Sequence, residues 1–316
     1  MAAGAFPALR AANVVILQAQ SHPNVLILLP VHNRRETTAL FIRCLLAQTY
    51  ANWHLLLIDD GSADGTADMV RAQVNRLTVL HGTGDWWWGG SLHQAYLWFK
   101  QRPDHLSDLV LIINDDTEFE PDFLDQAVRA MEPRSLLLAQ LYDQAGAFLE
   151  AGVRWDWRKC SGVGVKETEG LNCFSTRGLF LWARDFCEIG GFHPVLLPHY
   201  FSDYEFTMRA HAKGFSLISR PGVFLRYNDQ LTGVRSHEGQ SLARYLKTSF
   251  SMRSTNNPVY WSSFVVLTCP PRYMLTSLAA VCWRFWAPFI TRLKLYQITH
   301  GILRRIYRMA KRGAHP

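Results

Sequence analysis

The sequence predicts an α/β protein in which a mostly parallel, doubly wound sheet is followed by a basic helical extension. Short aliphatic runs alternate with helix-like segments, and several of these runs end directly in acidic or polar residues. No acidic residue follows Glu238, although basic residues continue to Arg312. With 316 residues, 48% of them hydrophobic, the chain can bury a large core. We expect a leader over 1–22, one large domain over 23–245 and a tail over 246–316.

Each expected strand of the sheet is a short aliphatic run, at 25–29, 54–58, 77–80 and 109–113. Runs of this length suit strands that are buried on both faces. Apolar residues at helical spacing predict helices over 37–48, 67–75 and 91–101. Right-handed crossovers between parallel strands place all their carboxyl ends at one edge of the sheet.

The residues that follow these strands are polar: His32-Asn33, Asp59-Asp60, Gly84-Asp85 and Asn114-Asp115-Asp116. Two adjacent carboxylates after a buried strand need a compensating cation or hydrogen bonds. They indicate a divalent metal that carries an anionic ligand, or a solvated turn that caps the next helix. Convergence at one edge favours the metal. No GxGxxG or GxxxxGK[ST] motif points to a dinucleotide or P-loop site.

Three segments, Pro30-Val31-His32-Asn33, Leu57–Thr66 and Asn114-Asp115-Asp116, precede Ile189-Gly190-Gly191-Phe192 and Asp203-Tyr204-Glu205. Together they resemble family 2 glycosyltransferases with the Rossmann-like GT-A fold, over roughly residues 24–240. The resemblance implies an inverting transfer of a sugar from a nucleotide diphosphate to a hydroxyl of a glycan or lipid-linked glycan. It also implies a nucleotide-sugar half at about 23–120 and an acceptor half at about 121–245.

The resemblance assigns roles to individual residues. Asp203 would be the general base, although the family's Glu-Asp-x-Asp is here Ser202-Asp203-Tyr204-Glu205, and Asp203 also suits a helix N-terminus. Asp116, with His237 as a second candidate, would bind Mg²⁺ or Mn²⁺. Asp59 would stabilise its own turn. The expected nucleotide- and donor-binding residues are Pro30, His32, Asn33, Glu36, Asp60, Asn114 and Asp115.

The segment Gly84-Asp85-Trp86-Trp87-Trp88-Gly89-Gly90-Ser91 departs from the family, whose members tend to carry a basic residue here. Its tryptophans could stack on a sugar or base, form a platform for a lipid-linked acceptor, or pack in the core. At least one should line the cleft, and Trp88 is our candidate. Gly89 would allow the backbone to approach the diphosphate.

The tail contains two apolar, aromatic stretches, 261–267 and 273–290, the second interrupted by Arg284 and Pro288. We expect an amphipathic helix that lies on an anionic membrane surface rather than one that spans it. The alternative is a helical hairpin packed on the catalytic domain or on a second subunit. We expect no nucleic-acid partner. Six cysteines without CxxC spacing suit a reducing compartment, so we expect a cytoplasmic protein at the inner face of the cell membrane.

Two other functions remain open from the sequence. A nucleotidyltransferase also places carboxylates at a sheet edge, but it would have a glycine-rich loop after the first strand, and Pro30–Glu36 contains no glycine. A catalytically degenerate sugar-binding or scaffold protein would fit the altered Ser202–Glu205 segment and the tryptophan-rich loop.

Overall fold

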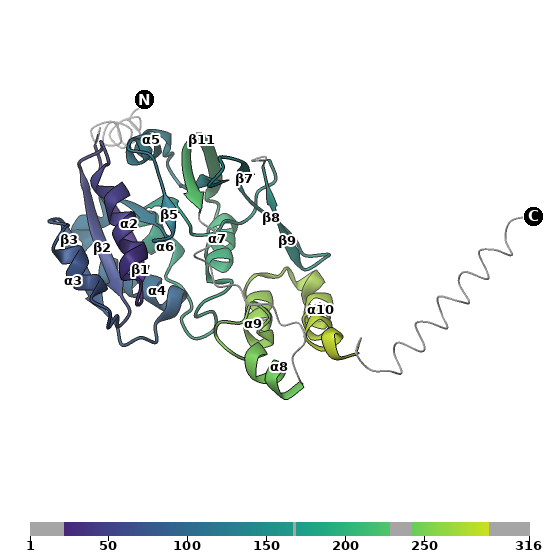
Figure 1. Ribbon diagram of the computed structural model, residues 1–316. Coiled ribbons are helices and arrows are strands. Elements are labelled where there is room, and N and C mark those ends of the chain that lie inside the picture. Colours follow the sequence, from purple (N-terminus) through teal and green to yellow (C-terminus); the bar gives the residue numbers. More distant parts are fainter. Residues whose placement is uncertain (1–21, 167–168, 228–241, 291–316) are drawn as a thin grey trace, which may run out of the picture. The chain divides into compact units, whose positions relative to one another are not determined.

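The computed structural model describes residues 22–166, 169–227 and 242–290, which form two compact units (Figure 1). The first unit comprises Met1–Trp155 and Gly162–Gly233, and the second comprises Asp156–Ser161 and Val234–Pro316. The expected leader before His22, the loop that carries His237 and the basic segment after Ile290 lie outside the described residues.

One sheet organises the first unit, and its strands run in the order β3-β2-β1-β4-β10-β6-β11-β5, with β7 paired to β6. A separate hairpin consists of β8 (Gly152–Asp156) and β9 (Ser161–Val165). The strands of the large sheet are β1 (Val25–Val31), β2 (Trp53–Asp59), β3 (Leu77–His81), β4 (Leu109–Ile112), β5 (Thr117–Glu118), β6 (Ser135–Asp143), β7 (Phe148–Glu150), β10 (Leu179–Trp182) and β11 (Ser216–Tyr227).

The sheet is mixed, which corrects the expectation that it would be mostly parallel. Strands β3, β2, β1 and β4 are parallel, as the aliphatic runs predicted. Beyond β4, however, β10 is antiparallel to both β4 and β6, and β5 is antiparallel to β11. Among the described strands, the parallel prediction therefore holds for β1, β2, β3 and β4, whereas beyond β4 only β6 and β11 pair in parallel.

Helices cover both faces of this sheet because successive residues of a strand point to opposite faces. Val25, Ile27 and Leu29 of β1 pack with α2, α3 and α5, whereas Leu26 and Leu28 pack with α4, α6 and α7. Figure 1 shows α2 and α3 alongside β1, β2 and β3. The helices are α2 (Arg35–Leu46), α3 (Thr66–Arg71), α4 (Trp87–Lys100), α5 (Phe123–Ala130), α6 (Ala183–Ile189) and α7 (Ser202–Ala212), with a 3₁₀ turn over Pro103–Ser107.

The described part of the second unit is helical: α8 (Leu242–Ser249), α9 (Pro258–Thr268) and α10 (Pro271–Ile290). Asn257 caps α9, because its side-chain oxygen accepts hydrogen bonds from the N–H groups of Val259 and Tyr260. Val265 and Val281 form a small core with Cys160 and Cys269. No described helix is both long enough and apolar enough to cross a bilayer.

Candidate active site

The carboxyl ends of β1, β2 and β4 meet at one edge, which confirms the convergence predicted from the sequence. Val31 pairs with Asp59, and Leu28 pairs with Ile112. The loop after β1 then contacts the loop after β2: Nδ1–H of His32 donates to the carbonyl oxygen of Asp60 at 2.5 Å. This bond leaves Nε2 of His32 as the acceptor of the Asn33 side-chain amide, 3.0 Å away.

Asn33 links the same two loops through its own backbone and side chain. Its φ of +52° is a left-handed conformation that asparagine tolerates better than most residues. Its N–H donates to Oγ of Ser62 at 3.0 Å, and its Oδ1 accepts from the N–H of Ala63 at 2.8 Å. Pro30 is part of β1, and Glu36 is exposed in the first turn of α2. No side-chain hydrogen bond holds Glu36 toward the loops among the contacts of the described residues.

The two carboxylates after β2 have different surroundings. Oδ1 of Asp59 accepts from the N–H of Ser62 at 3.0 Å, so Asp59 stabilises its own turn. Asp60 accepts three backbone N–H groups: Gly84 at 2.8 Å on Oδ1, and Trp86 at 2.9 Å and Trp87 at 3.0 Å on Oδ2. Asp60 thereby fixes the tryptophan-rich loop and places a negative charge at the N-terminus of α4.

The carboxylates after β4 also differ. Asp115 accepts from Nε of Arg34, at 2.8 Å on Oδ1 and 3.0 Å on Oδ2, and from the hydroxyl of Thr38 at 2.9 Å. Burial raises the pKa of Asp115, although Arg34 opposes the shift. Asp116 is also buried, yet its Oδ1 has no hydrogen-bond partner among the described residues, and its Oδ2 lies 3.9 Å from Nη2 of Arg34. Asn114 accepts the hydroxyl of Thr117 on its carbonyl oxygen.

Asp116 has one carboxylate oxygen that no described residue contacts through a hydrogen bond. A buried carboxylate oxygen without a partner is costly unless a cation or donor approaches it. The described residues contain no group of three or more His, Cys, Asp or Glu arranged to hold a metal by themselves. A metal at Asp116 would therefore need further ligands from water, from a bound substrate or from His237, which lies outside the described residues.

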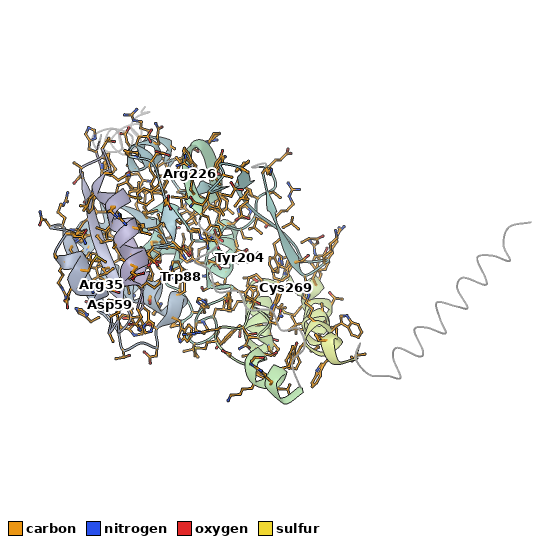
Figure 2. All side chains as sticks on the ribbon, viewed as in Figure 1. Arg35, Asp59, Trp88, Tyr204, Arg226 and Cys269 are labelled. Atoms are coloured by element: carbon orange, nitrogen blue, oxygen red, sulfur yellow. The ribbon has the colours of Figure 1, made fainter. Side chains whose placement is uncertain are left out.

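The tryptophan-rich segment begins a helix, contrary to the expectation that α4 starts at Ser91. Trp87 and Trp88 form the first turn of α4, and Trp87 has a φ of +55°. Trp88, labelled in Figure 2, is half-buried, and its Nε1–H donates to the hydroxyl of Thr176 at 3.0 Å. It packs in the core cluster between the sheet and α4.

Gly89 is needed for a close approach, but the neighbour is the protein's own chain rather than a diphosphate. A Cβ at this position would lie 2.5 Å from the carbonyl oxygen of Leu197 and 3.2 Å from Cβ of Ser202. The N–H of Gly89 donates to the carbonyl oxygen of Pro198 at 2.8 Å. The glycine thus seats the segment that leads into α7.

Asp203 lies in the first turn of α7, preceded by Phe201 in a left-handed conformation. Its carboxylate is half-buried and accepts the N–H of Tyr204 at 2.9 Å. Burial raises the pKa of Asp203 to about 6. Backbone hydrogen bonds and the charge of Arg177 lower this pKa to a smaller extent, and the charge of Glu150 adds to the rise. A carboxylate with this pKa is ionised at neutral pH and still a useful proton acceptor.

Glu205, which replaces the family's second aspartate, has a structural role. It is 2% exposed, and both its oxygens accept from Arg209, at 2.8 and 3.0 Å. Arg209 also donates to the carbonyl oxygens of Ile189 and Gly191, which ties α7 to the segment after α6. Of these two carboxylates, Glu205 is therefore the one engaged in an ion pair among the described residues.

These observations define a class of protein: an α/β fold of the GT-A type, with carboxylates at the ends of β2 and β4 and a further one on a distal helix. Residues 26–176 match the family model "Glycosyl transferase family 2". This match confirms the resemblance of the motifs to glycosyltransferase family 2 over that range.

Similar proteins agree with this assignment. The polyprenol monophosphomannose synthase of Mycolicibacterium smegmatis is 22% identical over 235 residues, 69% of this chain and 82% of that protein. The mannosyltransferase PcManGT of Pyrobaculum calidifontis, in complex with GDP-Man and Mn²⁺, has a TM-score of 0.50 and 15% identity over 91% of this chain and 83% of its own. TarS of S. aureus in complex with UDP-GlcNAc has a TM-score of 0.51 and 14% identity, over 86% and 76%. At these identities the two structures establish the fold.

Proposed function

We propose that this family 2 glycosyltransferase transfers a sugar with inversion from a nucleoside diphosphate to a hydroxyl of a glycan or lipid-linked glycan, with Asp203 as general base and a divalent metal at Asp116. The observation that carries the proposal is that the three carboxylates have different surroundings. Asp115 is neutralised by Arg34, whereas Asp116 keeps a buried oxygen without a partner and Asp203 keeps a raised pKa.

Asp116 and the diphosphate of the donor would hold Mg²⁺ or Mn²⁺ together, and both ions prefer such oxygen ligands. The ion would act as a Lewis acid that neutralises charge on the departing diphosphate. PcManGT was solved with GDP-Man and Mn²⁺, which supports a metal of this kind. His237 remains a candidate as a further ligand.

In the proposed reaction Asp203 accepts the proton of the acceptor hydroxyl while that oxygen attacks the anomeric carbon. The bond from this carbon to the phosphate oxygen breaks, and its electron pair leaves with the diphosphate. Because attack and departure occur on opposite faces, the anomeric centre inverts. The pKa of about 6 keeps the Asp203 carboxylate mostly ionised at neutral pH.

The loops after β1 and β2 are the proposed nucleotide site, through Pro30, His32, Asn33, Glu36 and Asp60. Support comes from the exposed positions of His32 and Asn33 beside Asp60 and from the hydrogen bonds that fix both loops. Asn114 and Asp115 would contact ribose or sugar. Trp88 and Gly89 both contact the protein itself. Their proposed role at the donor site is therefore indirect: they position the segment in which they lie.

The second unit is proposed to place the enzyme on an anionic membrane surface at the inner face of the cell membrane. Leu275, Trp283 and Trp286 are 82%, 54% and 49% exposed, at a spacing that puts them along one side of α10. Arg284 lies over the Trp261 ring at 4.7 Å and so belongs to another side. Tryptophan suits the membrane interface, and a chain segment without acidic residues suits anionic lipid.

The decisive experiment compares Asp116→Asn and Asp203→Asn with the wild-type chain. UDP and GDP are titrated with and without Mn²⁺, and release of nucleoside diphosphate is measured from UDP-GlcNAc and GDP-mannose. We expect Asp116→Asn to lose metal-dependent binding and Asp203→Asn to bind normally but lose turnover. Wild-type rates in both variants would refute the site. Binding without turnover in the wild-type chain, over a wider donor and acceptor panel, would favour a degenerate binding protein.

A further inference from the structure

Arg177 lies at the same edge of the sheet, just before strand β10. It lies two residues before Leu179, and Leu179 pairs with Ile112 in the antiparallel β10–β4 ladder. Asn114 lies two residues after Ile112, so the pairing brings Arg177 to the end of β4 where the Asn114-Asp115-Asp116 motif begins. The N–H of Gly178 donates to the carbonyl oxygen of Ile112 at 3.0 Å and holds this approach.

The side chain of Arg177 stacks on an aromatic ring, and its charge acts on the proposed base. Its guanidinium carbon lies 4.2 Å from the centre of the Tyr227 ring, which provides a flat support. Tyr227 itself pairs with Thr117, directly after the acidic motif. The positive charge of Arg177 lowers the pKa of both Asp203 and Glu150, although burial outweighs it at each carboxylate. The guanidinium is therefore close enough to act on both.

One donor of this guanidinium has no partner in the described part of the chain. Nε of Arg177 is buried and makes no hydrogen bond to any described residue. In Arg34 and Arg209, by contrast, Nε donates to Asp115 and to Glu205, although Nη2 of Arg34 also has no hydrogen-bond partner among the described residues. A buried donor without an acceptor is costly, and guanidinium groups match phosphate and carboxylate oxygens in particular.

The geometry points to an oxyanion-binding site at Arg177, beside Asp203, that receives a phosphate or carboxylate group of a substrate. This inference rests on the proposed function, because it concerns the same reaction centre. Two sources share the chemistry: the diphosphate of the donor, and an anionic group of the acceptor. The site supplies a positive charge that the loop before α4 lacks, since no Lys or Arg occurs from Leu77 to Phe99.

The test uses the full chain and the variants Arg177→Gln and Arg177→Lys. Arg220→Gln is the matched control, because Arg220 is an exposed arginine whose partner is Glu132 on the surface. Calorimetry first compares UDP and GDP with uridine and guanosine, all with Mn²⁺. Inorganic phosphate is then titrated into protein saturated with the nucleoside diphosphate that binds. Thermal melting checks the folding of each variant.

If the donor is the source, Arg177→Gln weakens diphosphate binding about tenfold or more while nucleoside binding stays unchanged, because a hydrogen bond to a charged group is lost. If the acceptor is the source, diphosphate binding is unchanged and phosphate binding to the saturated protein is lost. Arg177→Lys keeps the charge and should retain part of the affinity. If Arg177→Gln does not fold, the partial loss of affinity in Arg177→Lys tests the inference instead. Unchanged binding in both titrations would overturn the inference. Failure of the proposed function looks different: the wild-type chain would bind neither nucleoside diphosphate.

Discussion

Replacing Asp203 by Asn is expected to abolish turnover and at the same time stabilise the fold at neutral pH. Asn is nearly the same size as Asp, and its side-chain oxygen can still accept the N–H of Tyr204. It cannot take up the proton of an acceptor hydroxyl. It also removes a charge that burial disfavours, since desolvation is the largest cause of the raised pKa of Asp203.

The size of the stability gain follows from this pKa. One pKa unit corresponds to about 1.4 kcal/mol, so the change from 3.8 to about 6 corresponds to about 3 kcal/mol. Because the pKa is higher in the folded state, the folded protein holds its proton at pH values where the unfolded chain has lost it. The free energy of unfolding contributed by Asp203 therefore falls as pH rises from about 4 to about 6, and the cost is complete above that range. Partial exposure of the side chain makes about 2 kcal/mol a reasonable expectation at pH 7.5.

Urea unfolding at pH 5 and pH 7.5 measures this gain, and release of nucleoside diphosphate measures turnover. Asp185→Asn is the matched control: Asp185 is 3% exposed in α6, and burial likewise raises its pKa to about 6. It should give a similar gain in stability with normal turnover. The wild-type rate should fall as pH drops through about 6. A destabilised Asp203→Asn, a gain that does not grow with pH, or full turnover would refute the reasoning.

Three further substitutions test other parts of the structure. Asp60→Ala removes the acceptor of three backbone N–H groups and should lower the free energy of unfolding by about 3 kcal/mol in urea titrations; unchanged stability would contradict the hydrogen-bonding role. Gly89→Ala places a methyl group 2.5 Å from the carbonyl oxygen of Leu197, so we expect a loss of about 1–3 kcal/mol and reduced turnover, and a fully active, stable variant would count against this packing. Trp283→Ala combined with Trp286→Ala should reduce co-sedimentation of the full chain with anionic vesicles but leave turnover of a soluble donor unchanged; undiminished sedimentation would remove α10 from the membrane contact.

The parallel half of the sheet could be predicted because its signal is local. The runs 25–29, 54–58, 77–80 and 109–113 are mostly aliphatic, and each forms a strand, although β3 at the edge of the sheet is only partly buried. The alternation with helices then determined the crossover geometry and the common edge. Helix boundaries were less accurate, since α4 begins at Trp87, four residues before the expected position.

The mixed half could not be predicted in the same way. Leu179–Trp182 has the composition of a buried strand, but composition does not encode the direction in which a strand enters a sheet. The β10–β4 pairing joins segments far apart in the sequence and depends on the whole chain between them. The position of Arg177 is a consequence of this topology, so it was not found from the motifs. The contact between Arg34 and Asp115 joins the loops after the parallel strands β1 and β4.

The hydrogen bonds of Asp60 are compatible with its proposed role in nucleotide binding. A carboxylate offers about four acceptor positions, two on each oxygen. In Asp60 the N–H groups of Trp86 and Trp87 take both positions on Oδ2, and Gly84 takes one on Oδ1. One acceptor position on Oδ1 is left, which is what a single imide or amine N–H of a base requires. A Cβ at position 82 would lie 2.6 Å from this oxygen, so a residue larger than glycine would crowd it. The hydrogen bonds that fix the tryptophan-rich loop would therefore orient the same carboxylate for a nucleotide base, and a substitution at Asp60 should affect loop stability and nucleotide affinity together.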